Sequence, residues 1–219
     1  MTAPDQSRFT AHLRELADPI WQAQHQHPFV RGLADGSLPT ETFRAWLLQD
    51  YLFLVEYCRL LALGVARAPD MATATRLADV LHATLHEEMT LHRRCAAEFG
   101  IAEAQLASGE MADITRAYTD HLLRVAAVDD FALLAAALLP CMWGYSELGR
   151  RLAQDRPSPE PRYRAWIETY ADPAFAELAG WCRELVDQLA ADAGPEMRSR
   201  MRREFLLSSR FELSFWSVG

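Results

Sequence analysis

Apolar residues recur along almost the whole chain at intervals of three and four positions, which is the period of a helix with one buried face. Hardly any stretch alternates apolar and polar residues between turn signals, as a half-buried strand would. The pattern therefore predicts an all-α protein.

Proline, glycine and aspartate signals divide this pattern into about eight helices. The breaks fall at 27–29, 35–39, 68–70, 99–101, 128–130, 155–161, 171–173 and 193–195. The connections are short, and no repeat or low-complexity segment occurs. We therefore expect residues 1–219 to form a single helical domain, with stripes of Phe, Leu, Trp and Met in its core.

Several predicted helix starts carry residues that can cap a helix. Ser37 and Thr40, on either side of Pro39, are candidates for the start that follows the second break. Asp130 and Asp172 lie where the positive end of a helix dipole favours an acid.

Composition excludes several classes of protein. Half of the residues are hydrophobic and 24% are charged, which is typical of a globular chain. The formal net charge is −8, and the basic residues of 198–205 are mixed with acids, so we expect no nucleic-acid partner. None of the four cysteines has the spacing of a zinc site or of a secreted disulfide scaffold.

The sequence predicts neither a secretory signal nor a membrane span. The first residues lack a basic and then apolar leader. The longest mostly apolar run, Phe131 to Tyr145, is about 15 residues long, whereas a membrane span needs about 20. We expect a cytoplasmic protein with reduced thiols and no membrane partner.

The stretch 138–149 places a proline, a thiol and a phenol within six positions. Pro140 cannot donate a backbone hydrogen bond, so a kink is expected there. Cys141 and Tyr145 are four positions apart and share a face of the helix. Spacing alone is compatible with a buried, inert thiol or with a catalytic one.

Two carboxylates lie in apolar helices. Asp50 shares a helix face with Phe53 and Tyr57. It can form a buried pair with an arginine or tyrosine, or accept from the amino group of a ligand. Glu212 is surrounded by aromatic residues and is either a general acid or a surface residue at the polar edge of its helix.

The segment 82–92 is rich in histidine and glutamate and could supply metal ligands. Di-iron bundles use a Glu-x-x-His motif on each of two helices, and the sequence contains no such motif. We therefore expect no metal here, and interpret the segment as a polar helix that faces solvent or a neighbouring subunit. The metal alternative rests on His82, His86, Glu87 and Glu88.

Five stretches together resemble the TenA family (thiaminase II or aminopyrimidine aminohydrolase), in its cysteine-bearing branch. They are 27–54, 86–101, 138–149, 166–175 and 208–216. The resemblance implies a heme-oxygenase-like multi-helix bundle that is usually a homotetramer and needs no metal or organic cofactor.

The resemblance also implies roles for single residues. Cys141 matches the nucleophile and Glu212 the catalytic acid. Asp50 matches the carboxylate that holds the ring nitrogen and amino group of a pyrimidine. The tyrosines that match those lining the ring are Tyr118, Tyr145 and Tyr170.

One position departs from the pattern. Phe53 stands where many members carry a tyrosine, whose hydroxyl is thought to make the thiol more nucleophilic. The open alternatives are a changed rate, a shift of this task to Tyr118 or another group, and a changed substrate.

The implied activity is hydrolysis of the aminomethyl-pyrimidine left by thiamin breakdown, with cleavage of thiamin as a side activity. The alternatives are a metal-dependent oxidase on the same fold and a non-enzymatic regulator.

Overall fold

The computed structural model of the chain describes residues 8–154 and 157–218. In these residues it contains helices and turns but no strand, so the all-α prediction is confirmed. The helices are α1 (Phe9–His25), α2 (Pro28–Asp35), α3 (Thr40–Arg67), α4 (Met71–Ala83), a π-helix (Thr84–Glu88), α5 (Met89–Glu98), α6 (Glu103–Ala107), α7 (Asp113–Val128), α8 (Phe131–Gln154), α9 (Pro161–Ala171), α10 (Pro173–Ala191) and α11 (Pro195–Phe215).

These helices form two compact units. Unit 1 comprises Met1–Ser37 and Ala135–Leu213, and unit 2 comprises Leu38–Leu134 and Ser214–Gly219. The expectation that residues 1–219 form one domain stays a prediction.

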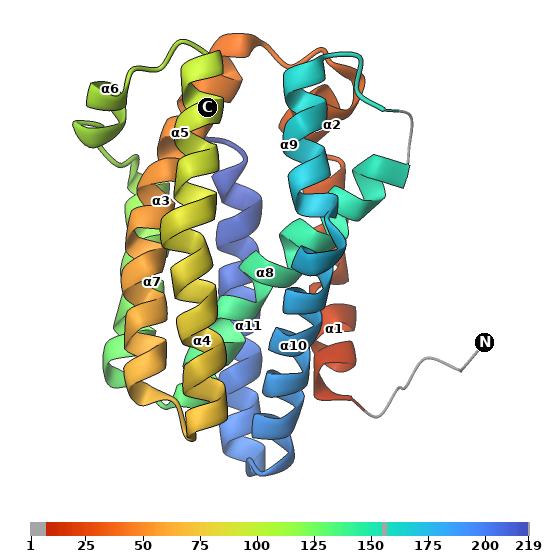
Figure 1. Cartoon of the computed structure of the whole chain (residues 1–219). Coiled ribbons are helices and arrows are strands. Elements are labelled where there is room, and N and C mark those ends of the chain that lie inside the picture. The colour runs from red at the N-terminus through yellow and green to blue at the C-terminus, as the bar shows by residue number, and fades with distance from the viewer. Residues whose placement is uncertain (1–7, 155–156, 219) are drawn as a thin grey trace. The chain divides into compact units, whose positions relative to one another are not determined.

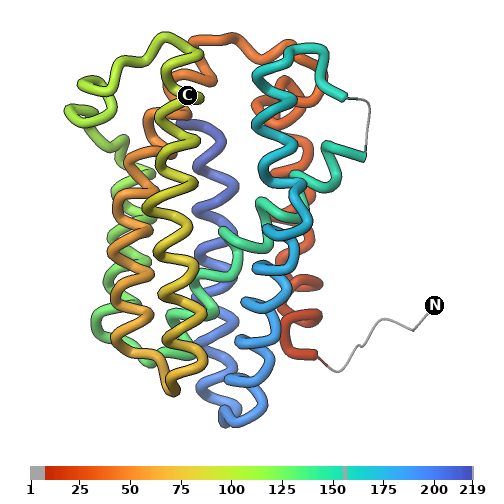
Figure 2. Tube along the Cα trace, viewed as in Figure 1, coloured from red at the N-terminus to blue at the C-terminus, as the bar shows by residue number. Residues whose placement is uncertain are grey.

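Unit 2 is built around the long helix α3, which contacts α4, α5 and α7 (Figure 1). The helices α4 and α5 and the π-helix between them follow one another as a continuous rod (Figure 2). Large aromatic side chains fill the interior: Trp46 stacks on Trp216 with ring centroids 5.4 Å apart and an interplanar angle of 8°. Rings packed this closely fix the direction in which α3 presents its other buried residues.

Unit 1 contains α1, α2, α9 and α10 and most of α8 and α11. In it α1 contacts α10 and α2 contacts α9. Trp21 is 1% exposed, packs edge to face on Trp143 at 5.2 Å, and donates its indole N–H to Ser209 Oγ over 3.2 Å. The buried indole thus has both an apolar environment and a hydrogen-bond acceptor.

The predicted breaks between helices within the described residues are confirmed, but the helices outnumber the expected eight. One additional break lies at residues 108–112, where Ser108 and Gly109 form a turn signal that the prediction did not use. The π-helix is the other difference: it separates α4 from α5 without ending the helical rod. The break predicted at 155–161 includes residues 155 and 156, which lie outside the described residues.

The predicted caps are confirmed at two helices and wrong at a third. Asp172 accepts a hydrogen bond from the N–H of Ala174 over 2.7 Å, and Asp130 accepts one from the N–H of Ala132 over 2.9 Å. At α3 the N-cap is Pro39, which has no side chain that can accept a hydrogen bond. Thr40 is already the first helical residue there, so its hydroxyl lies past the capping position.

The helix α8 is long and apolar enough to meet the length and composition criteria for a membrane span, but 78% of its most apolar window is buried in the protein. A mostly buried core helix meets the same criteria.

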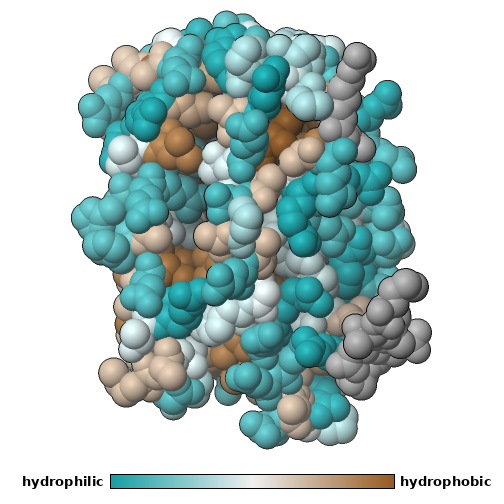
Figure 3. All heavy atoms as spheres, turned by 45° about the vertical axis from the view of Figure 1, so that its right-hand side comes forward, coloured by the Kyte–Doolittle hydropathy of each residue, from teal (hydrophilic) through white to brown (hydrophobic). Residues whose placement is uncertain are grey.

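On the face drawn in Figure 3, hydrophilic residues predominate and hydrophobic ones show in smaller patches. In the described part of the chain, the large hydrophobic side chains with substantial exposure are Leu16, Met71, Leu85, Leu91 and Val128.

Candidate functional site

Asp50 lies in the middle of α3 and is only 5% exposed. Its Oδ2 is 2.6 Å from Nε2 of His92, which is 4% exposed. The predicted alternatives for a buried partner were an arginine or a tyrosine, and the partner is instead a histidine from α5. A carboxylate in an apolar helix thus obtains the charged partner that its burial requires.

The π-helix immediately precedes the turn that carries His92. Its wider turn is closed by the N–H of Met89, which donates to the carbonyl of Thr84. The Nδ1 atom of His92 is 3.2 Å from the carbonyl oxygen of Glu88, the last residue of the π-helix. The imidazole ring is therefore held on both sides, by a side chain of α3 and by the backbone of its own rod.

Burial and charge shift the pKa values of this cluster. Burial lowers the pKa of His92, but the hydrogen bond to Asp50 and the charges of Asp50 and Glu88 outweigh it, so the pKa of His92 is raised above 6.5. Burial raises the pKa of the Glu88 carboxyl above 4.5, with His92 acting against this shift. Burial, together with the charge of Glu88, also raises the pKa of the Cys58 thiol.

Phe53 and Tyr118 lie against each other in the same unit. Their ring centroids are 5.2 Å apart, and Phe53 also stacks on Tyr57 at 6.0 Å. Tyr118 is 1% exposed and belongs to α7. The structure thus brings together two of the predicted ring-site residues and places both in the interior.

The start of α7 is fixed by Gln49, a residue that the sequence did not single out. Its Oε1 accepts from the hydroxyl of Thr115 and from the N–H of Ala112, each over 2.8 Å. Its Nε2 donates to the carbonyl of Glu110 over 2.9 Å. The residue beside Asp50 therefore sets the position of the helix that carries Tyr118.

In unit 1, Cys141 and Tyr145 lie one turn apart on α8, as predicted. Pro140 lies inside this helix, which remains helical on both sides of it. The side chain of Cys141 is half-buried, and Tyr145 is buried. Whether the helix bends at the proline stays a prediction.

Tyr145 is part of an aromatic cluster, which we define as Tyr145, Trp166, Tyr170 and Phe175. The centroids of Tyr145 and Tyr170 are 5.0 Å apart, those of Trp166 and Tyr170 are 4.7 Å apart, and Phe175 packs on Tyr170 edge to face at 5.5 Å. Two predicted ring-lining tyrosines thus meet, and two further rings that sequence reasoning missed support them. Flat aromatic surfaces of this kind suit a flat heterocycle.

A glycine allows the helices of this cluster to approach. A Cβ atom on Gly149 of α8 would lie 2.5 Å from the carbonyl carbon and 2.7 Å from Cβ of Tyr170 at the end of α9. Such distances are far below van der Waals contact, and the obstacle is partly backbone. Gly149 is therefore required for the contact between Tyr170 and Tyr145.

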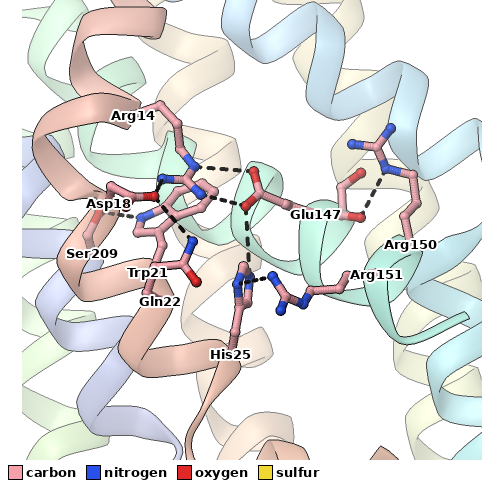
Figure 4. A network of polar contacts seen from close by, with 10 residues as sticks. Arg14, Asp18, Trp21, Gln22, His25, Glu147, Arg150, Arg151 and Ser209 are labelled. Carbon is pink, nitrogen blue, oxygen red and sulfur yellow. Dashed lines mark hydrogen bonds and ion pairs between the residues drawn. The ribbon is translucent and has the colours of Figure 1, made fainter. Parts of the chain in front are cut away.

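A polar network joins this part of α8 to α1 (Figure 4). Arg14 donates to both carboxylate oxygens of Glu147, over 3.2 and 2.7 Å, and to Asp18 over 2.8 Å. His25 lies 3.8 Å from Glu147, and Arg151 lies 3.2 Å from His25. A bidentate arginine–carboxylate pair fixes geometry as well as charge, so it holds the helical segment that carries Tyr145.

Glu212 lies on α11 in unit 1 and is 3% exposed. The alternative that placed it at the polar surface of its helix is therefore wrong. Its service as a general acid stays a prediction.

The histidine-rich segment does not form a metal site within the described residues. His82 and His86 pack ring to ring with centroids 4.4 Å apart, and both are exposed together with Glu87. Glu88 instead belongs to the cluster around His92. No group of three or more His, Cys, Asp or Glu side chains in the described ranges could hold a metal ion, so the metal-oxidase alternative lacks a ligand set there.

The chain is similar to known proteins in both sequence and structure. The model of the TENA/THI-4/PQQC family matches residues 14–219. The chain belongs to this family. A family member named aminopyrimidine aminohydrolase, from Halalkalibacterium halodurans, is 41% identical over 212 residues, which cover 96% of this chain and 95% of that protein. A Bacillus subtilis protein with the same name is 34% identical over 97% of this chain and 89% of its own.

Solved structures agree with this assignment. A TenA homologue from P. horikoshii OT3 has a TM-score of 0.88 and 30% identity, covering 96% of this chain and 97% of its own. Heme oxygenase 2 from Chlamydomonas reinhardtii shares the fold at a TM-score of 0.64 and 15% identity, covering 96% of this chain and 97% of its own. The predicted heme-oxygenase-like bundle of a TENA/THI-4/PQQC family member is thus confirmed.

Proposed function

We propose that this enzyme hydrolyses the aminomethyl-pyrimidine left by thiamin breakdown, as part of thiamin salvage. The reaction consumes water and releases ammonia and the hydroxymethyl-pyrimidine. The observation that carries the proposal is the full-length similarity to family members named aminopyrimidine aminohydrolase. Cleavage of thiamin itself would be a side activity.

Cys141 is the nucleophile in this proposal. A pyrimidine ring that accepts a proton on nitrogen becomes electrophilic, and the sulfur adds to a ring carbon. Loss of aromaticity lets the exocyclic methylene expel ammonia. Water then adds to the methylene carbon, and the sulfur leaves as the ring becomes aromatic again. A thiol of ordinary pKa is only a few per cent thiolate at neutral pH, so the enzyme must assist its deprotonation.

The two carboxyl groups have separate tasks. Glu212 donates the proton to the ring or to the leaving amine, and its burial supports this role because it keeps the carboxyl group away from bulk water. Asp50 accepts from the amino group and orients the ring. Its pairing with His92 supports this role, because the bond to Oδ2 fixes the orientation of the Asp50 side chain.

Aromatic residues hold the flat ring and complete the set. We assign Tyr145 and Tyr170 to the walls, which their contact supports. Phe53 has no hydroxyl, and we propose that Tyr118, whose ring packs on Phe53, supplies the hydroxyl that many members carry at that position. A cytoplasmic location and a homotetramer also belong to this proposal.

The test is the replacement Cys141→Ser, with ammonia release from the aminomethyl-pyrimidine as the measurement. Loss of a covalent nucleophile lowers kcat by about a thousandfold or more. Cys95→Ser, which changes another half-buried thiol, is the matched control and should retain the wild-type rate. Release of ammonia by Cys141→Ser at the wild-type rate would refute the mechanism.

A further inference from the structure

The cluster of Asp50, His92 and Glu88 shows a feature that neither the sequence pattern nor the roles assigned so far explain. Both ring nitrogens of His92 face oxygen acceptors, Oδ2 of Asp50 at 2.6 Å and the carbonyl of Glu88 at 3.2 Å. A neutral imidazole carries a proton on only one of its nitrogens, whereas the imidazolium donates from both. The geometry therefore favours His92 as a cation.

The charges around the ring agree with this assignment. The groups that act on His92 are Asp50 from α3 and Glu88 from the π-helix, and together they raise the pKa of His92 despite its burial. Burial also raises the pKa of Glu88, while the charge of His92 acts against this shift. The short contact between His92 and Asp50 thus pairs the buried imidazole with an acid that can offset its charge.

This arrangement fixes the orientation of Asp50 before a ligand arrives. The charge-assisted bond to His92 engages Oδ2, and a carboxylate has about four lone-pair sites, so it can still accept from a ligand. A side chain that is already oriented loses little conformational freedom on binding. The π-helix contributes because it sets the turn from which His92 extends.

We propose that His92 is a positioning residue that acts on the substrate through Asp50, holding this side chain directed at the amino edge of the pyrimidine. The inference rests on the proposed function, in which Asp50 accepts from that amino group. His92 itself does not touch the substrate. Its effect is therefore specific to ligands that carry the amino group.

The experiment compares two ligands by calorimetric titration. One is the hydroxymethyl-pyrimidine product, and the other is the same molecule without its ring amino group. His92→Ala should weaken binding of the first by about 10- to 100-fold, the range for a lost hydrogen bond to a charged group. Binding of the second should change by less than about threefold, and His92→Gln, which keeps a neutral donor, should restore part of the loss.

The matched control is His86→Gln, which alters an exposed histidine of the π-helix and should bind both ligands as the wild type does. If His92 served only the fold, His92→Ala would weaken the binding of both ligands equally, and that result would overturn the inference. Wild-type protein that neither binds the product nor releases ammonia would instead refute the proposed function, and the inference with it.

If His92→Ala does not fold, a measurement on the wild-type protein tests the proposed role of His92. The ¹⁵N signals of the His92 ring should indicate protonation of both nitrogens at neutral pH. The Nε2 signal should move on titration with the amino-bearing ligand and stay in place with the analogue. A ring that is neutral, or that responds equally to both ligands, would contradict the proposal.

Discussion

Tyr145 and Asp50 are both buried side chains well inside long helices, but contacts of different kinds hold them in place. Tyr145 packs ring against ring on Tyr170, at a position where Gly149 allows two helices to approach. Among the described residues, Asp50 is held by the charged partner His92. Ring packing depends on shape and does not change with pH, whereas a buried ion pair depends on protonation. The two units should therefore respond to different perturbations.

The largest effect is expected from Asp50→Leu. This replacement leaves the His92 ring buried without its acceptor, and breaking a buried pair costs about 3 to 5 kcal/mol. We expect about 3 kcal/mol, at the lower end of that range, because His92 can release its proton. The measurement is the free energy of unfolding in urea.

Two further variants sharpen this test. Asp79→Leu, at an exposed position of α4, should change stability by no more than about 0.5 kcal/mol. Replacing both Asp50 and His92 by leucine should recover much of the loss, because no unpaired charge remains. An Asp50→Leu protein as stable as the wild type would show that the pair adds nothing to the fold.

A smaller effect is expected from Gly149→Ala in unit 1. The added methyl group would lie 2.5 Å from the backbone of Tyr170, and such overpacking costs about 1 to 3 kcal/mol. The expected loss is about 2 kcal/mol in urea unfolding, with a shift in the fluorescence of Trp166 as its neighbour moves. Gly144→Ala on the same helix is the control, since nothing lies within 4 Å of its added Cβ atom. Equal stabilities of these two variants would contradict the requirement for glycine at 149.

The same comparison explains how far the sequence could predict the structure. Helical periodicity reports which face of a helix is buried, so the burial of Asp50 and Tyr145 and most helix ends could be predicted. Periodicity does not report which distant side chain meets that face. His92 is 42 positions from Asp50, and the meeting of the two depends on the packing of α5 on α3.

The histidine-rich segment shows the same limit in another form. Its histidines suggested metal ligands on one surface, but His82 and His86 are exposed while His92 is buried. The π-helix between α4 and α5 changes the register along the rod, and no residue type in the segment signals such a turn. Gly149 was missed for a related reason, because a glycine inside a helix does not indicate whether another backbone approaches it.

The smallest effect is a loss of stability above pH 6.5 that the pair of Asp50 and His92 should produce and the ring packing of Tyr145 should not. Because the pKa of His92 is raised above 6.5, the folded protein keeps a proton that the unfolded chain releases. The stabilisation is fully present below pH 6.5 and is lost as the pH rises from there through the folded pKa, at no more than about 1.4 kcal/mol per pH unit. His121, whose pKa burial lowers to about 4, has the opposite effect, but only below pH 6.5.

Urea unfolding between about pH 6.5 and pH 7.5 reports mainly on His92, since ordinary carboxyl groups titrate below this window and ordinary thiols largely above it. His92→Gln should flatten the decline because no proton is exchanged at that position. Gly149→Ala should be less stable at every pH but keep the wild-type slope, because ring packing binds no proton. If the slope persists in His92→Gln, another group carries the pH dependence. The region of Asp50 would then not differ from that of Tyr145 through the charge of His92.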